Sequence, residues 1–402
     1  MPAEPMRATT RRGLDGSVGM RIAQVAPLIE SVPPRNYGGT ERIVAYLSDA
    51  LLDLGHEVTL FASGDSRTRA RLVAVAPRAL RAARRAADWP MWTTLMLEQV
   101  QLEAERGAFD VIHFHVDVLP LPYARRWATP SVTTLHGRQD LPGLDRLYAR
   151  FCEHPLVSIS DSQRAPQAAA NWRATVPHGL PHDLYRFHPA HGDYFVFVGR
   201  ISPEKRVDRA IEIAVACGVP LRIAAKVDIT DRHYFAKQIR PLLNHPLVEF
   251  IGEIGEREKD DFVGNSRALL FPIDWPEPFG LVAIEALACG TPVLAYANGS
   301  MPEILQDGVD GFLVHDQAQA IAAAGRIEQI ARADCRASFE RRFTATAMAQ
   351  RYLDVYDDVR RRHRAVQIVE EHPHGRQDPH WQQVVCGGHL RPPRTESASP
   401  QE

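Results

Sequence analysis

The sequence predicts an α/β fold made of two Rossmann-like halves that face each other across a cleft. Short apolar segments alternate with helical periods along the chain, a pattern typical of parallel sheets covered by helices. The pattern begins again after a loop rich in histidine and proline at residues 178–193. A length of 402 residues also agrees with two domains.

The predicted elements fall into two sets. In the first half, strands are expected at residues 22–27, 56–62, 111–115, 132–136 and 156–159. In the second half, they are expected at residues 194–199, 221–225, 248–251, 268–273 and 291–296. Helices are expected over residues 40–54, from Gly280 onward, and over 344–363, which is long enough to return across the first half. We therefore place the first domain at residues 20–185 with 344–363, and the second at 186–343. Ligands of such sheets bind beyond the carboxyl ends of the strands, so the cleft is the expected site.

The two ends of the chain are polar. Residues 1–19 and 366–402 are too poor in apolar side chains to bury a core, and we expect both to be disordered. Met20 is followed at once by a predicted strand, so translation could begin at Met1 or at Met20.

Composition narrows the function and the compartment. The 47 basic residues are matched by 49 acidic ones, which gives no case for nucleic acid as a partner. The five cysteines are scattered without the spacing of a zinc site, a usage that favours a reducing compartment. No apolar run reaches the roughly 18–20 residues of a spanning helix, and no secretory signal is evident. We expect a cytoplasmic protein.

Two acids stand out in the second half, around the start of a predicted helix. Glu277 lies in the loop before this helix, and Glu285 lies on it. The first amides of the helix, at Gly280, Leu281 and Val282, have no partner within it and suit an anion. A carboxylate one to two turns further on can accept hydrogen bonds from a ribose diol. The arrangement predicts a nucleotide site.

The segment EPFGLVAIE, followed by ALACGTPVLA, closely resembles the donor-binding motif of retaining glycosyltransferases of family 4. These enzymes have the GT-B fold and use nucleotide-activated sugars. The resemblance implies that Glu277 holds the transferred sugar, that Glu285 holds the ribose, and that Phe279 lies in the donor site. An ordinary helix with a capping acid would also carry two acids at this spacing. It would not require the PFG between them or the turn of small residues that follows.

A paired glycine follows the first predicted strand. Gly38, Gly39 and Thr40 open the next helix, and glycines let the backbone approach a ligand closely. The GxGxxG fingerprint of nicotinamide and flavin proteins is missing, and a purely structural turn is the alternative. In family 4 the matching loop closes over the donor phosphate and borders the acceptor. The resemblance therefore implies that both glycines bind the donor and that Thr40 lies on the acceptor side of the cleft.

A segment that begins with Gly199-Arg200 and ends with Lys205 follows the first predicted strand of the second half. This segment is similar to the GR…EK segment of the family, whose Arg and Lys hold the diphosphate. Fixed cations in a dry cleft stabilise the charge of a departing diphosphate. The chain reads DWPEP where an Asp-x-Asp metal motif would be expected, so we predict no metal and no cofactor. A solvated basic turn is the alternative, and Arg206 replaces a glycine common in the family.

Three histidines belong to predicted strands of the first half. The resemblance places His136 close to the transferring sugar, while a histidine capping a core strand is the alternative. His113 and His115 share one face of their strand and could reach a metal, but no third ligand is evident. The resemblance instead implies that they line the acceptor side of the cleft.

A basic run on a predicted alanine-rich helix precedes two tryptophans. Its members are Arg78, Arg81, Arg84 and Arg85. Some family members act on membrane lipids, and such a helix suits an anionic surface. A solvated face is the alternative.

The sequence therefore predicts a metal-independent retaining glycosyltransferase. It would move a hexosyl unit from a nucleoside diphosphate sugar to an acceptor hydroxyl, with UDP favoured and GDP-mannose as the other candidate donor. The acceptor is not readable, because acceptor loops vary freely on this fold. Two alternatives stay open, a GT-B sugar-nucleotide epimerase and a catalytically silent nucleotide-sugar binding protein.

Overall fold

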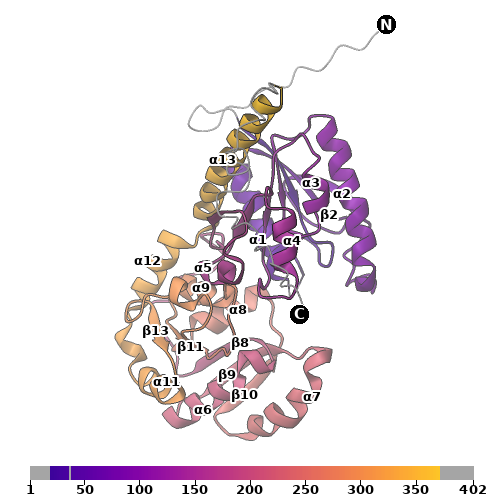
Figure 1. Ribbon diagram of the computed structural model, residues 1–402. Coiled ribbons are helices and arrows are strands. Elements are labelled where there is room, and N and C mark those ends of the chain that lie inside the picture. Colours follow the sequence, from indigo (N-terminus) through magenta and orange to yellow (C-terminus); the bar gives the residue numbers. More distant parts are fainter. Residues whose placement is uncertain (1–18, 36–37, 372–402) are drawn as a thin grey trace, which may run out of the picture.

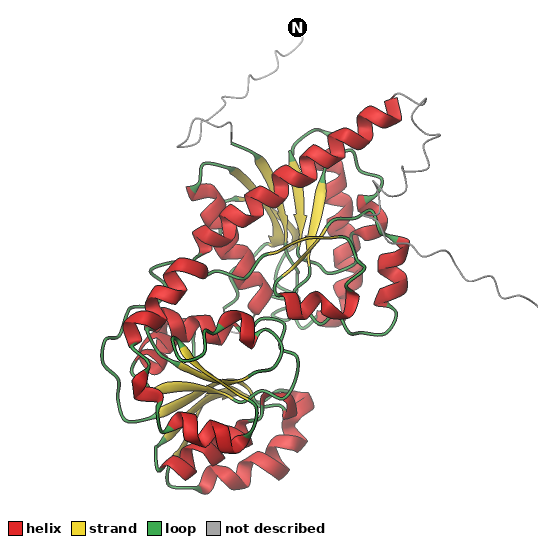
Figure 2. Cartoon of the chain, turned by 60° about the vertical axis from the view of Figure 1, so that its left-hand side comes forward, coloured by secondary structure: helices red, strands yellow, loops and turns green. Residues whose placement is uncertain are grey.

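A computed structural model describes residues 19–35 and 38–371, with side chains to residue 365. The predictions for residues 1–18 and 372–402 lie outside these ranges. The predicted fold class is confirmed: two parallel sheets, each covered by helices, lie one beyond the other along the molecule (Figures 1 and 2).

The first sheet has seven strands in the order β3-β2-β1-β4-β5-β6-β7. These are β1 (Arg21–Val25), β2 (Glu57–Ser63), β3 (Arg71–Ala76), β4 (Val111–Phe114), β5 (Ser131–Thr134), β6 (Leu156–Ser158) and β7 (Trp172–Thr175). All five strands predicted for this half are present. β3 and β7 were not predicted, because they are partly exposed edge strands, and β3 follows β2 without an intervening helix.

The helices of this domain are α1 (Gly39–Asp53), α2 (Trp89–Glu105), α3 (Leu121–Ala124), α4 (Leu144–Arg150) and α5 (Asp161–Arg164). α1 forms because Ile43, Leu47 and Leu51 recur at helical spacing and bury one face. β1 and β4 are neighbours although α1, β2, β3 and α2 separate them in sequence. The strand order therefore reverses between them, and the start of α1 lies at this switch point.

The prediction that the basic run from Arg78 to Arg85 lies on an alanine-rich helix is wrong. Residues 77–85 form bends and turns, and Arg84 has a φ of 57°. The amides of Leu80 and Arg81 donate to the carbonyls of Leu28 and Ile29, at 2.9 and 3.1 Å. Because these amides bond to the loop after β1, they are not available to a helix.

The second sheet has six strands in the order β10-β9-β8-β11-β12-β13. These are β8 (Phe195–Arg200), β9 (Leu221–Lys226), β10 (Val248–Gly252), β11 (Ala268–Phe271), β12 (Val293–Tyr296) and β13 (Gly311–Val314). Its helices are α6 (Val207–Cys217), α7 (Arg232–Tyr234), α8 (Glu256–Gly264), α9 (Leu281–Cys289), α10 (Met301–Ile304), α11 (Gln317–Ala324) and α12 (Arg332–Arg342). β13 was not predicted, since it is a four-residue edge strand.

The chain crosses between the domains twice, and the two crossings lie side by side. The amide of Leu180 donates to the carbonyl of Phe343 at 2.9 Å, and the amide of Ala345 donates to the carbonyl of Leu180 at 2.7 Å. A Cβ on Gly179 would lie 2.3 Å from the carbonyl oxygen of Thr344, so only glycine fits this approach.

The helix that follows, α13 (Ala345–Glu371), lies along the first domain (Figure 1). Its buried face includes Met348, Tyr352 and Tyr356. Disorder was predicted from residue 366, but residues 366–371 continue this helix, because no breaker occurs before Pro373. Within residues 19–35 and 38–371, none of the helices is long and apolar enough to cross a bilayer.

Candidate active site

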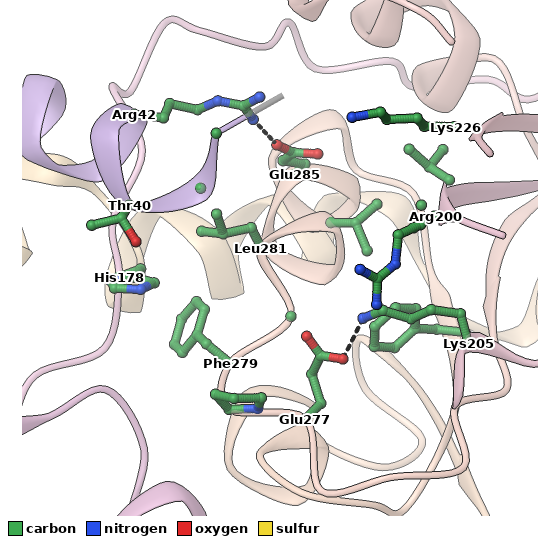
Figure 3. Close-up of a pocket in the computed structure, with 18 of the residues that line it drawn as sticks. Thr40, Arg42, His178, Arg200, Lys205, Lys226, Glu277, Phe279, Leu281 and Glu285 are labelled. Carbon is green, nitrogen blue, oxygen red and sulfur yellow. Dashed lines mark hydrogen bonds and ion pairs between the residues drawn. The ribbon is translucent and has the colours of Figure 1, made fainter. Parts of the chain in front are cut away.

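A cavity of about 460 Å³ lies between the domains, at the carboxyl ends of the strands. Both domains line it (Figure 3). Twelve of the predicted site residues line this cavity: Gly38, Gly39, Thr40, His136, Arg200, Lys205, Glu277, Phe279, Gly280, Leu281, Val282 and Glu285. Residues from both halves of the sequence thus meet at one place.

Two helix starts meet at the cavity. Gly280 precedes α9 with a left-handed φ of 83°, and a Cβ there would lie 2.6 Å from Cε of Met301. This residue therefore needs to be glycine to bring the first amides of α9 to the cavity wall. A Cβ on Gly39, in the first turn of α1, would lie 3.6 Å from Cδ1 of Leu281. The positive ends of two helix dipoles therefore lie close together, an arrangement that favours an anion such as a diphosphate.

Glu277 is held in place before α9 by two donors. Lys205 forms an ion pair with its Oε2, and the indole Nε1 of Trp275 donates to the same oxygen at 2.7 Å. The Lys205 ammonium also lies 5.4 Å and 5.3 Å from the ring centres of Phe271 and Trp275. These contacts fix the carboxylate and leave its other oxygen for a ligand.

Arg200 leaves the end of β8 on the second-domain wall of the cavity. Its guanidinium pairs with Glu204, and its Nε lies 3.6 Å from Oδ2 of Asp231. Figure 3 shows Arg200 beside Lys205, with Lys226 further along the same wall. This wall is therefore basic and faces the two helix starts.

Glu285 is almost fully buried, at 2 % exposure, and is bound by cations from both domains. Nη1 of Arg42 lies 2.7 Å from its Oε1, and Nζ of Lys259 lies 3.0 and 3.1 Å from its two oxygens. Burial alone would raise the pKa of Glu285, but Lys259 and Arg42 outweigh it and hold the pKa below its usual value. The side chain is therefore a carboxylate. In Figure 3, Glu285 and Glu277 lie on opposite sides of Leu281.

Arg42 and Lys259 were not among the predicted residues. Arg42 lies one turn after Gly39 on the same helix, and this spacing could have suggested it. Lys259 lies on α8, which has no motif that points to a ligand.

His136 lies two residues beyond β5 and is neutral. Burial lowers its pKa to about 3. Its ring stacks on that of His178, with centres 5.3 Å apart, and His178 in turn meets the ring of Phe279. His178, from the crossing between the domains, lines the cavity and was not predicted to belong to the site. His178 reaches the cavity only because of the way the crossing folds, and the local sequence does not reveal that fold.

The expectation that His113 and His115 line the acceptor side of the cleft is wrong. Their exposures are 0 % and 2 %, and neither borders the cavity. β4 is a central strand, and the tyrosines of α13 cover the face that carries these rings. They lie behind His136 instead, where His115 is bonded to it.

The described residues contain one group of three side chains that could hold a metal. It consists of His188, Asp260 and Asp261, and it lies outside the cavity. Arg186 pairs with both aspartates, and His188 bonds to Asp260. This is an ion-pair cluster on the second domain.

Comparisons with known proteins agree with this geometry. Residues 187–348 match the family model "Glycosyl transferases group 1", and residues 37–188 match "Glycosyltransferase Family 4". A D-inositol 3-phosphate glycosyltransferase of Kribbella flavida is 30 % identical over 356 residues, which cover 71 % of this chain and 82 % of that one. One of the same name from Streptomyces griseus is 32 % identical over 237 residues, 52 % of this chain and 48 % of that one.

Two solved structures illustrate the fold. AviGT4, a glycosyltransferase involved in avilamycin A biosynthesis, is 27 % identical with a TM-score of 0.64, covering 85 % of this chain and 98 % of its own. HepE of Anabaena, solved with UDP-glucose, is 16 % identical with a TM-score of 0.64, covering 84 % of this chain and 100 % of its own.

Two parallel sheets with a basic cleft between them and helix starts on both sides have the GT-B architecture, and the family matches make this chain a glycosyltransferase. The chain belongs to glycosyltransferase family 4. The recognition made on the Glu277 motif is thereby confirmed.

Proposed function

We propose that this glycosyltransferase moves a hexosyl unit from a nucleoside diphosphate sugar to an acceptor hydroxyl, with retention and without a metal. The observation that carries the proposal is the pair of carboxylates on either side of the start of α9. Glu285 with its two cations suits the ribose, and Glu277 with Lys205 suits the hexose. The diphosphate then lies between them, on the amides of α9 and beside Arg200 and Lys205.

UDP is the favoured nucleotide, and GDP is the other candidate. HepE, which shares the fold, was solved with UDP-glucose, so UDP-sugars are the first donors to test. The relative from Kribbella flavida is named for D-inositol 3-phosphate, so this compound is the first acceptor to test. A cation-lined cleft agrees with an acceptor that carries a phosphate.

Retention is proposed to follow from attack on the same face of the sugar. Both donors on Glu277 hold it as a hydrogen-bonding group, and no role as a nucleophile is required of it. The bond between the anomeric carbon and the phosphate oxygen breaks, and the acceptor oxygen forms the new bond. The departing phosphate oxygen takes the acceptor proton, and Arg200, Lys205 and the start of α9 stabilise its charge.

The test begins with the donor. Binding should raise the melting temperature, and UDP-glucose, other UDP-sugars and GDP-mannose can be ranked by this shift. The preferred donor, radiolabelled, is then incubated with and without D-inositol 3-phosphate. A labelled product whose new bond keeps the anomeric configuration of the donor supports the proposal. An inverted product, or an epimerised donor without transfer, contradicts it.

A peripheral contact with membranes is also proposed for the region of residues 78–102. Arg81 and Arg85 pair with Glu30 and Asp88, which reduces their free charge. Four apolar side chains of α2 are exposed, with Met91 at 50 %. These exposed side chains are Trp89, Met91, Leu95 and Leu102. Flotation with anionic vesicles, but not with zwitterionic ones, is the expected result. Equal flotation of the protein with both kinds of vesicle, or no flotation with either kind, contradicts this membrane contact.

A further inference from the structure

A line of hydrogen bonds inside the first domain joins the C-terminal helix to the cavity. The hydroxyl of Tyr356, on α13, accepts from Nε2 of Gln24 at 3.0 Å. Oε1 of Gln24 lies 2.7 Å from Nε2 of His115, and Nδ1 of His115 lies 2.9 Å from Nε2 of His136. Gln24, His115 and Tyr356 are buried, and His136 borders the cavity.

The amide of Gln24 determines which atom donates and which accepts in each hydrogen bond of this line. An amide oxygen can only accept, so Nε2 of His115 must carry a proton and donate it. Burial and then the neighbouring His113 lower the pKa of His115 well below its usual value, so the ring is neutral and carries this one proton. Its Nδ1 can therefore only accept, and the donor to it is Nε2 of His136.

This assignment leaves a defined group at the cavity. The neutral His136 has its one proton on Nε2, so its Nδ1 is an acceptor. Among the described residues this Nδ1 is buried and has no hydrogen-bond partner. A buried acceptor without a partner is unfavourable, and His136 lines the cavity, so a hydroxyl of the bound substrate is the partner that would satisfy it.

The Tyr356 hydroxyl holds Gln24 in this orientation, and the line continues beyond it to residues that do not bond to Gln24. The Tyr356 hydroxyl, which accepts from Gln24, can donate its own proton to Nδ1 of His113, 2.8 Å away. Nε2 of His113 then donates to Thr134, at 2.7 Å, and Thr134 bonds to the Tyr352 hydroxyl at 3.0 Å. Every link therefore agrees with one direction of donation.

We propose that Gln24 and Tyr356 are positioning residues that keep the proton of His136 on Nε2, so that Nδ1 accepts a hydrogen bond from a substrate hydroxyl. The proposal rests on the proposed function for the identity of that hydroxyl. The proton positions themselves can be measured without any substrate.

The first test is nitrogen-15 NMR of the full chain with labelled histidine. The chemical shifts of the two ring nitrogens distinguish the tautomers of a neutral imidazole, and His136→Asn identifies the His136 signals. The expected result is protonation on Nε2 in both His115 and His136 at neutral pH. A proton on Nδ1 of His136 overturns the proposal, whether or not the protein transfers a sugar.

The second test compares two tyrosines of α13. Tyr356→Phe removes the acceptor of the Gln24 amide, so a mixture of His136 tautomers and a fall in kcat of about tenfold are expected, with the donor KM unchanged. Tyr352→Phe removes an equally buried hydroxyl at the far end of the line and should change neither tautomer nor kcat. Equal effects of the two variants on kcat would assign the loss to packing and overturn the proposal.

The third test is a rescue at Gln24. Gln24→Glu keeps an oxygen that accepts from Nε2 of His115, and Gln24→Leu does not. The Glu variant should retain the wild-type tautomer of His136 and a kcat within a few-fold of the wild type, while the Leu variant should lose about tenfold. The same kcat in both variants contradicts a role in proton positioning.

Discussion

The two carboxylates of the cavity differ in their partners. Glu277 is bound by Lys205 and Trp275 of its own domain, whereas Glu285 is bound by Lys259 of its own domain and Arg42 of the other. Each carboxylate keeps hydrogen-bonding capacity for a ligand, and the start of α9 lies between them (Figure 3). Substitutions at these positions should therefore separate recognition of the sugar from recognition of the nucleotide.

Replacing Glu277 with Gln tests the sugar side. The change keeps the size and one oxygen but removes the charge that pairs with Lys205. Affinity for the free nucleoside diphosphate, measured by calorimetry, should stay almost unchanged. The transfer rate should fall by about 10²-fold or more, because the lost contact acts mainly during bond breaking. Equal losses in both quantities would assign Glu277 to the nucleotide.

Replacing Glu285 with Ala tests the nucleotide side. A charge-assisted hydrogen bond contributes about 1.5–3 kcal/mol, so affinity for the free nucleoside diphosphate should fall about tenfold or more. Glu285→Gln is the matched control, since it keeps the shape and an acceptor and should lose less. Unchanged affinity of the Ala variant for the free nucleotide would rule out a ribose contact.

The proposal that Arg200 and Lys205 take the place of a metal ion at the diphosphate can be tested with a chelator and with substitutions. If Arg200 and Lys205 neutralise the diphosphate, transfer should survive a strong chelator. Arg200→Ala and Lys205→Ala should each lower kcat by about 10²-fold, the scale of losing one preorganised charge-stabilising group. Activity that disappears in chelator and returns with magnesium or manganese would contradict this role.

At the scale of elements, the second domain could be predicted well from the sequence, because β11 and α9 carry their own signals. The buried run Leu269–Ile273, the left-handed Gly280 and the two acids are all local features. β3, β7 and β13 lack such signals, since they are short or partly exposed edge strands.

The parts of the site that could not be predicted depend on distant segments. The partner of Arg42 lies 243 residues away, in the other domain. His113 and His115 were assigned to the cleft because a strand shows which residues share a face but not what covers it. Tyr352 and Tyr356, more than 200 residues later, cover that face.

The buried histidines of the first domain predict how its stability depends on pH. Burial lowers the pKa of His136 and of His154 to about 3, so both are neutral in the folded state but titrate near 6.5 when unfolded. The unfolded chain therefore binds more protons between these values. The free energy of unfolding should fall as pH drops below about 6.5, by up to roughly 1.4 kcal/mol per pH unit for each such histidine. Urea unfolding at pH 7.5, 6.5 and 5.5 measures this. A urea midpoint that stays the same at all three pH values would contradict the burial of neutral histidine rings.

At the scale of the whole molecule, the two domains are joined across the cleft as well as through the chain. Arg42 on α1 pairs with Glu285 on α9, and Tyr46 on α1 donates to Glu256 on α8. The paired crossings at Leu180 and Ala345 form one connection between the domains, and these contacts across the cleft form a second. A donor that binds Glu285 therefore meets both domains at once.

The return of α13 to the first domain has a consequence for synthesis on the ribosome. The sheet of the first domain is complete in sequence by Thr175, but its buried Gln24, His113 and Thr134 bond to tyrosines of a helix that begins at Ala345. While the second domain is being made, these polar groups lack the tyrosine hydroxyls and keep only their bonds within the first domain, so this domain stays incomplete until α13 has been synthesised. A fragment of residues 19–190 should bind a dye for exposed apolar surface, and adding a peptide of residues 344–371 should abolish this binding. Vectorial folding, in which each domain is finished as it emerges, is therefore available to the second domain but not to the first.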